Sequence, residues 1–317
     1  MTIVTRNVYG DGTGDYTTLN AALVAESNKN LPNADISVVY NCKGAIGTSG
    51  TSNITAANGW VTDATHTITI STTTANRHTG LRNTGAYLTG GYYIFSSDVP
   101  YLTIDGVGFG ASSGGSALYI NSNGGWVTIK NCCVWDIATG NAGIAVFATG
   151  ATDVRNIINN LIYKCGYGIN KRNSHIAYIY NNTIINCITY GIRMVDVGTS
   201  YLKNNAVFGS GTTDLYSGGS DTEYKTTNYT SDASGNTQVT IASCNFTSIT
   251  SGSENGNTGA SSSLRKKGTD LSTDATYPFN YDYTNTTRPT GLLQWDIGAY
   301  QNFLDIPITF KPIIIIV

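Results

Sequence analysis

The sequence predicts an all-β protein: a right-handed, single-stranded parallel β-helix with an N-terminal capping helix and an extended C-terminal arm. Three observations lead to this prediction. A six-residue pattern with two central asparagines recurs at Ile157–Ile162, Ile179–Ile184 and Leu202–Val207, with starts 22 and 23 residues apart. Glycine followed by isoleucine recurs 11 to 14 residues into the coils, as at Gly168 and Gly191. Charged residues make up only 12% of the chain.

The repeat indicates a solenoid, because each copy reads as one short strand that is too small to bury its own apolar face. The same frame continues upstream to Ile129–Val134 and Ile104–Phe109, so we expect at least five coils. The short β-branched runs end at Gly or Asn, which argues against helical repeats, and scattered leucines argue against leucine-rich repeats. The handedness rule for parallel crossovers predicts right-handed winding.

The composition agrees with stacked coils. Coils lie about 4.8 Å apart, so like charges in one column would repel along the whole axis. The net charge of -2 argues against nucleic-acid binding, which needs concentrated Lys and Arg. With 317 residues and no Pro-rich or Ser-rich linker before residue 210, we expect one elongated domain.

Residues 1–44 are predicted to form the N-terminal cap. Apolar residues between Asp15 and Ser27 predict an amphipathic helix, N-capped by Asp15 or Thr17 and ended around Pro32. The strand Ile36–Tyr40 follows. A helix over the open end of the first coil would shield exposed strand edges.

Residues 45–249 are predicted to form the β-helix, with early strands at Thr67–Ile70 and Tyr92–Phe95. The asparagine columns could bind a sugar, but we favour a structural role. Stacked amides hydrogen-bond from coil to coil, and Asn tolerates the left-handed backbone of a tight corner. Cys165 and Cys187 should stack, as buried free thiols unless their geometry permits a bridge.

Residues 250–317 are predicted to be irregular with a hydrophobic terminal strand. That strand is too short to span a membrane and too apolar to stay in water. We expect it to pair with the domain, with sister chains or with a larger assembly. The predicted assembly residues are Ile313, Ile314, Ile315, Ile316 and Val317.

Catalytic residues are not evident, because the Asp residues of the repeats do not share a column. The best candidates are Asp153, His175 and Asp196 on neighbouring coils, although turn and surface roles are favoured for them. His66 and His78 have no partners at ligand spacing, so we expect no metal ion and no cofactor.

Tyrosine is abundant, with 21 residues on a chain of low charge, which suits sugar stacking or a protein interface. We predict an outward tyrosine strip as a contact surface. Its members are Tyr163, Tyr167, Tyr178, Tyr180, Tyr190 and Tyr201.

The segment Gly14–Leu23, the Asn-Asn coils and the motif Trp295–Tyr300 resemble the right-handed parallel β-helix proteins of the pectate-lyase-like superfamily. The resemblance covers roughly residues 8 to 215 plus the late motif. The superfamily includes lyases, hydrolases, epimerases, adhesins and tailed-phage spikes, so the resemblance implies the fold and leaves the activity open. The Gly-His-Gly and Arg-Ile-Lys signatures of polygalacturonase relatives and the pectate-lyase arginine motif are not found in the sequence.

The low charge, the lack of a signal peptide after Met1 and the hydrophobic end resemble a structural component of a tailed-phage virion. We expect a surface spike, fibre or head-decoration subunit, made in the host cytoplasm and located in the virion. By analogy with β-helical spikes, we expect a homotrimer with other virion proteins, and a host-surface glycan, as partners. The alternatives are a polysaccharide depolymerase, either lyase or glycosidase, and a bacterial surface adhesin.

Overall fold

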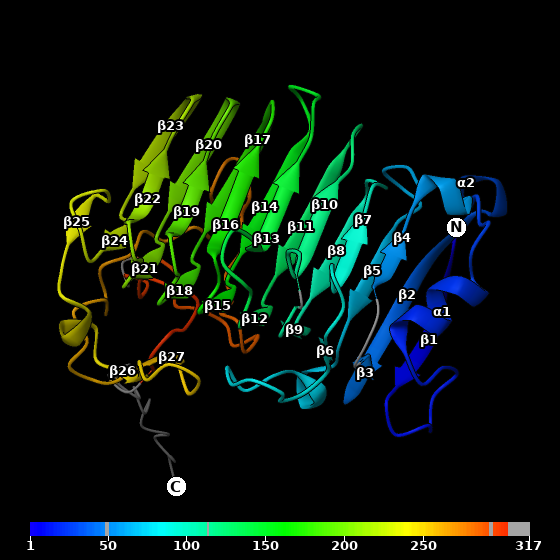
Figure 1. Cartoon of the computed structure of the whole chain (residues 1–317), viewed down its shortest axis with the longest axis horizontal. Helices are drawn as coiled ribbons and strands as arrows, with labels where there is room; N and C mark the ends of the chain where they lie inside the picture. The colour runs from blue at the N-terminus through cyan, green and yellow to red at the C-terminus, as the bar shows by residue number, and fades with distance from the viewer. Residues whose placement is uncertain (48–50, 113, 292–293, 304–317) are drawn as a thin grey trace, which may run out of the picture.

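The chain winds into a parallel β-solenoid (Figure 1), which confirms the predicted fold class. The computed structural model describes residues 1–47, 51–112, 114–291 and 294–303. Three parallel sheets, here called sheets I, II and III, run along the solenoid axis, and each regular coil contributes one strand to each sheet.

Sheet I holds the longest strands: β1 (Thr2–Tyr9), β2 (Ile36–Lys43), β5 (Ile68–Ser71), β8 (Leu102–Asp105), β11 (Trp126–Lys130), β14 (Val154–Ile158), β17 (His175–Tyr180), β20 (Val197–Lys203) and β23 (Ser220–Thr226). Sheet II holds β3 (Ala45–Gly47), β6 (Tyr87–Thr89), β9 (Gly108–Gly110), β12 (Cys133–Trp135), β15 (Leu161–Tyr163), β18 (Thr183–Ile185), β21 (Ala206–Phe208), β24 (Tyr229–Thr230) and β25 (Thr237–Gln238). Sheet III holds β4 (Ser52–Ile54), β7 (Phe95–Ser97), β10 (Leu118–Asn121), β13 (Ala142–Phe147), β16 (Tyr167–Arg172), β19 (Tyr190–Met194) and β22 (Thr213–Ser217).

The two repeated sequence patterns mark the residues that pair with one another in sheets I and III. In sheet I the first residues of the five predicted repeats pair in one buried column: Ile104, Ile129, Ile157, Ile179 and Leu202. In sheet III the isoleucines that follow the repeated glycines form a second buried column with the leucines at the equivalent positions of the outer coils: Leu118, Ile144, Ile169, Ile192 and Leu215. These columns meet in the interior and form the main core.

The sequence predicts that each six-residue repeat is one strand. The structure shows that this prediction is wrong. Each repeat spans the last two residues of a sheet I strand, a corner of two residues, and the first two residues of a three-residue strand of sheet II. The first asparagine of each pair, and Asn131 at the equivalent position of an earlier coil, adopts left-handed backbone, with φ between 53° and 55° at Asn131, Asn159, Asn181 and Asn204. This conformation, which Asn tolerates better than most residues, turns the chain from sheet I to sheet II.

The second asparagine of each pair builds a buried ladder, which confirms the structural role predicted for it. The Asn182 Oδ1 accepts from the backbone N–H of Asn160 at 3.0 Å, and its Nδ2 donates to the carbonyl of Ile157 at 2.8 Å. Asn205 and Asn228 repeat the pattern one and two coils further on, and Asn236 ends the ladder.

The predicted capping helix is present as α1 (Leu19–Ala25), followed by the short α2 (Leu31–Ala34). Leu19, Ala22 and Leu23 are buried against the first coil. The predicted N-cap is wrong: Thr18 caps the helix by accepting from the N–H of Ala21. Asp15 does not cap it, because its carboxylate accepts from the N–H of Asn7.

After residue 230 the chain runs back along sheets I and II (Figure 1). It includes η3 (Ile241–Cys244), β26 (Phe246–Ser248) and β27 (Asn255–Thr258), and earlier loops hold η1 (Ala56–Asn58) and η2 (Thr74–Asn76). We call residues 263–302 the C-terminal strap. The predicted assembly strand at Ile313–Val317 lies outside the described residues.

The corner asparagines hold the strap against the solenoid. Nδ2 of Asn159 donates to the carbonyl of Tyr281, and Nδ2 of Asn204 donates to that of Thr269, both at 2.8 Å. All six cysteines are buried free thiols. In the described part of the chain, no helix is long and apolar enough to cross a membrane.

Candidate functional site

The outer face of sheet I carries a straight row of polar and aromatic side chains. Each member immediately precedes an interior residue of the repeat, so it points away from the core. Strand register places the row in the order Thr103, Thr128, Asn156, Tyr178, Tyr201 and Tyr224. We call this face, with the strap along its side, the sheet I groove.

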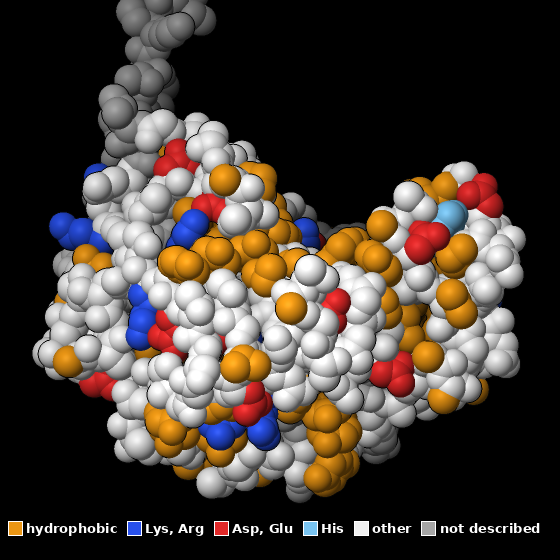
Figure 2. Space-filling view, turned by 90° about the horizontal axis from the view of Figure 1, so that it is seen from above, with side chains coloured by type: hydrophobic (Ala, Val, Ile, Leu, Met, Phe, Trp, Pro, Cys, Tyr) orange, Lys and Arg blue, Asp and Glu red, His pale blue; other side chains and the backbone are white. Residues whose placement is uncertain are grey.

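The first half of the row forms a pocket of about 360 Å3. Trp126, Lys130 and Tyr277 line it together with Thr103, Thr128 and Asn156. Asn156 Nδ2 donates to the Thr128 hydroxyl at 2.9 Å, whereas its Oδ1 has no hydrogen-bond partner among the described residues. An aromatic wall with hydroxyl and amide groups on its floor is the chemistry of a site for a polar, ring-shaped ligand. Figure 2 shows the molecule hollowed between its two ends, with hydrophobic side chains gathered along the hollow.

A charged cluster lies beside the pocket. Arg77 Nη1 is 2.8 Å from Asp105 Oδ1, and Lys130 Nζ is 3.5 Å from Asp105 Oδ2. Burial alone would raise the pKa of Asp105, but the charges of Arg77 and Lys130 outweigh it and lower the pKa. Burial would lower the pKa of Lys130, and Asp105 more than offsets this, so that pKa is raised. Both groups are therefore charged at neutral pH.

A separate ion pair lies further along the groove. Lys203 Nζ is 2.5 Å from Asp274 Oδ2 and lies 5.1 Å from the ring centroid of Tyr180. Burial would raise the pKa of Asp274, but hydrogen bonds from Lys203 and Thr276 hold it at about 2. Asp274 of the strap and Lys203 of β20 thus form a fixed ion pair beside the row.

The second half of the row is a tyrosine ladder. The ring centroids of Tyr178 and Tyr201 are 5.2 Å apart, and those of Tyr201 and Tyr224 are 4.8 Å apart, with interplanar angles of 29° and 11°. The rings face one another, so the ladder turns ring edges and hydroxyl groups outward. At its end, Tyr224 is 51% exposed.

The predicted tyrosine strip requires correction, because its six members lie on three sheets. Tyr163 and Tyr180 are fully buried, beneath the segments of the chain that run back along sheets II and I. Tyr178 and Tyr201 belong to the sheet I ladder, while Tyr167 and Tyr190 stack on sheet III with ring centroids 5.7 Å apart. Residues close in sequence separate here because each coil has three faces.

The weak catalytic candidates do not form a site. The carboxylate of Asp153 accepts from the N–H groups of Gly124 and Gly125 in a turn. Asp196 accepts from Arg172 Nε and from the N–H of Asn173. His175 is buried inside the solenoid, and burial lowers its pKa to about 3. The three side chains therefore lie in separate environments and do not converge on one site.

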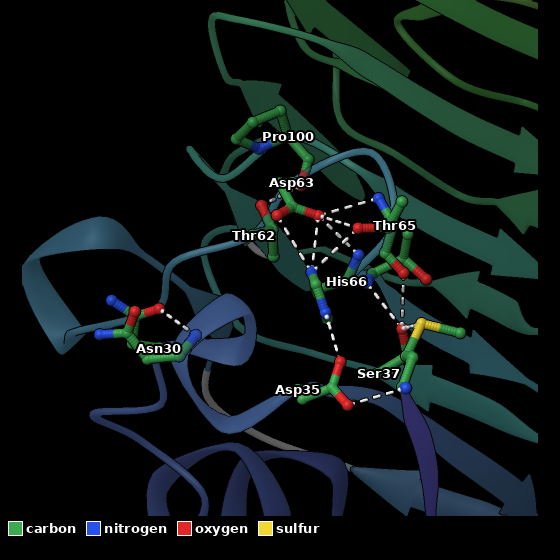
Figure 3. Close-up of polar contacts among 11 residues, drawn as sticks. Asn30, Asp35, Ser37, Thr62, Asp63, Thr65, His66 and Pro100 are labelled. Atoms are coloured by element: carbon green, nitrogen blue, oxygen red, sulfur yellow. Dashed lines mark hydrogen bonds and ion pairs between the residues drawn. The ribbon is translucent and has the colours of Figure 1, made fainter.

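His66 forms a polar cluster near the N-terminal cap (Figure 3). Its Nδ1 is 2.9 Å from Asp63 Oδ1, and its Nε2 is 3.2 Å from Asp35 Oδ1. The two carboxylates lie on opposite sides of the ring, so they cannot share one ion with it. Among the described residues, no group of three His, Cys, Asp or Glu side chains could hold a metal ion.

The sequence interpretation missed Trp126, Lys130, Asn156 and Tyr277. For Asn156 the signal lay in the repeat. It occupies the same position as Tyr178 and Tyr201, directly before the interior apolar residue of the coil. Tyr277 belongs to the irregular strap, where no periodicity indicates the position of a side chain.

No protein-family model matches the sequence, and no curated protein matches it significantly. Among solved structures, the chain is similar to the crystal structure of pectate lyase Pel9A. The TM-score is 0.41 and 13% of residues are identical, over 95% of this chain and 96% of that chain. A similarity of this degree says nothing about substrate or activity.

Proposed function

We propose that this protein binds a surface glycan along the sheet I groove without cleaving it. The observation that carries the proposal is the pocket of about 360 Å3 at Trp126 and Tyr277, continued by the tyrosine ladder in a single row. The row repeats about every 4.8 Å along the solenoid. Such a periodic surface of hydroxyl, amide and aromatic groups suits a linear polymer of similar repeat.

Binding is favoured over cleavage by the protonation states in the groove. Glycoside hydrolysis needs a carboxylic acid with a raised pKa, and lyase chemistry needs a base that is free of its proton. The pKa values of Asp105 and Asp274 are lowered, and that of Lys130 is raised. The carboxylates are thus poor acids and Lys130 is a poor base.

The biological role that we propose is attachment, as a spike, fibre or head-decoration subunit of a tailed-phage virion. The low charge of the chain and its five terminal β-branched residues support this role. A glycan-binding solenoid and an assembly tail would provide the two contacts that an attachment subunit needs, one to the host and one to the particle.

The test is binding to a panel of purified bacterial capsular and cell-wall polysaccharides, by surface plasmon resonance. We expect Trp126→Ala and Tyr201→Ala to weaken binding about tenfold or more, because each removes an aromatic contact. The matched control is Tyr190→Ala, which removes a tyrosine from the middle of the ladder on sheet III.

If Tyr201→Ala and Tyr190→Ala lost the same amount of binding affinity, the assignment of the glycan site to sheet I would be contradicted. Release of reducing ends or unsaturated sugars from a bound polysaccharide would show a depolymerase and overturn the non-catalytic part of the proposal. Binding to none of the polysaccharides would remove the support for an attachment role.

A further inference from the structure

We propose that a second pocket, here called the Tyr300 pocket, binds an uncharged saccharide independently of the sheet I groove. The pocket has a volume of about 470 Å3 and lies between residues 74–79 of an early coil and the C-terminal part of the chain. Its lining combines the hydroxyl groups of Thr74, Thr79 and Thr284 with the amide of Asn257 and the ring of Tyr300.

One wall of this pocket is held rigidly. The rings of His78 and Tyr283 stack with centroids 5.4 Å apart and an interplanar angle of 7°. The Tyr283 hydroxyl lies 3.1 Å from the carbonyl of Thr79 and 2.8 Å from Asn257 Oδ1. His78 Nε2 is 2.6 Å from the carbonyl of Asn131. Fixed side chains bind a ligand with little loss of conformational entropy.

Several polar groups of the lining remain available. Within the described part of the chain, the Tyr300 and Thr74 hydroxyls and the Asn257 amide nitrogen make no hydrogen bond to the protein. Asn257 Oδ1 accepts a hydrogen bond from the Tyr283 hydroxyl. The Nδ2 group of the same amide is therefore available to donate to a ligand. Two hydroxyls and one amide donor beside a half-buried aromatic ring match the alternating hydroxyl groups and apolar faces of a sugar.

The pocket carries no free charge. Arg77 lines it but is paired with Asp105 at 2.8 Å. His78 is neutral at physiological pH, because burial lowers its pKa to about 4. An acidic sugar would therefore lose hydration without gaining an unpaired cation, so the site favours neutral saccharides.

A further pocket of about 450 Å3 adjoins this one, and the two share Asn257 and Tyr300. The Tyr300 ring therefore borders both spaces. A ligand of more than one sugar unit could extend past the ring from one pocket to the other.

The experiment is isothermal titration calorimetry of the full chain with maltotriose, cellotriose and chitotriose. Trigalacturonate serves as the acidic comparison. We expect at least one neutral trisaccharide to bind and Tyr300→Ala to weaken it about tenfold, while Tyr300→Phe weakens it less. Ala75→Trp, on the exposed rim, should block binding without removing a packed side chain. Circular dichroism checks that each variant is folded.

The sheet III variant Tyr190→Ala lies outside both proposed sites, so it is the matched control and should leave trisaccharide binding unchanged. This proposal and the groove proposal can fail separately, because each is tested by variants of its own lining residues. The inference is overturned if no neutral trisaccharide binds, if folded Tyr300→Ala and Ala75→Trp both bind normally, or if trigalacturonate binds as tightly as the neutral sugars.

Discussion

A single asparagine can join three coils of this solenoid. The side chain of Asn182 contacts Asn160 and Ile157 on the preceding coil and Asn205 on the following one. Its amide is fully buried, so water cannot replace the hydrogen bonds. The repeated asparagines are therefore explained by the stability of the corners, without a ligand.

We predict that Asn182→Ala lowers the free energy of unfolding by about 3 kcal/mol, because it leaves several buried polar groups without partners. Urea unfolding followed by tryptophan fluorescence measures the loss. The control is Asn121→Ala at an exposed position, which should stay within about 0.5 kcal/mol of the original protein. Similar losses of unfolding free energy for the two variants would contradict the stabilising role of the asparagine ladder.

The His66 cluster predicts a pH dependence. Hydrogen bonds to Asp35 and Asp63 raise the pKa of His66, while hydrogen bonds from the N-terminal ammonium group and from His66 lower that of Asp35. A raised histidine pKa gives a stabilising contribution that is complete below about pH 6.5 and is lost as the pH rises through the folded-state value.

His66→Gln should therefore destabilise the protein more at about pH 5.5 than at about pH 9. The measurement is the midpoint of urea unfolding for both proteins at each pH. Added salt should shrink the difference, since the carboxylates are solvent-exposed and screened. A difference that is the same at both pH values would contradict the ionic character of the cluster.

Among the elements, the strap encloses a buried charged group, the guanidinium of Arg288. Arg288 donates to the carbonyls of Tyr281 and Gly298 at 3.2 and 2.9 Å and to Gln301 Oε1 at 3.1 Å, and it lies 5.2 Å from the Trp295 ring centroid. Burial lowers its pKa to about 10, so it stays protonated at neutral pH. The motif Trp295–Tyr300 closes around this guanidinium.

Replacing Arg288 by Met should release the strap at a cost of about 3–5 kcal/mol, because buried acceptors lose their donor. Hydrogen exchange with mass spectrometry should show lost protection in residues 263–302 and retained protection in the strands of sheet I. Arg288→Lys keeps the charge but lacks the fork of donors, so it should give an intermediate loss. Retained protection throughout the strap would contradict this role.

The elements also show how far the sequence alone leads. Repeat spacing correctly predicts the interior columns of sheets I and III, because a fixed period gives each position one orientation. It does not reveal the corner within the six-residue repeat, since only the backbone conformation of Asn159 and its equivalents separates the two strands. The strap has no period, so neither its docking nor the position of Tyr277 in the groove could be predicted.

At the scale of the whole molecule, both ends of the solenoid are closed to further coils. At the N-terminal end, α1 covers the core. At the other end, the interior positions of β23 carry Asp221, Glu223 and Lys225, in register with Gly198, Ser200 and Leu202. Asp221 is buried in an ion pair with Lys171. Charges at these inward positions disfavour the stacking of another coil or of a second molecule.

If the ends of the solenoid do not stack, we expect the hydrophobic terminus to mediate assembly. We predict that the full-length chain forms a defined oligomer, for which a trimer is the expectation from the sequence, and that a form truncated after Asp305 is a folded monomer. Light scattering coupled to size exclusion gives both masses, and circular dichroism checks the fold of the truncated form. Burial of Ile313–Val317 between chains would supply the driving force, because five β-branched residues lose their contact with water. Two soluble monomers would contradict the assembly role and leave the glycan sites as the remaining support for an attachment protein.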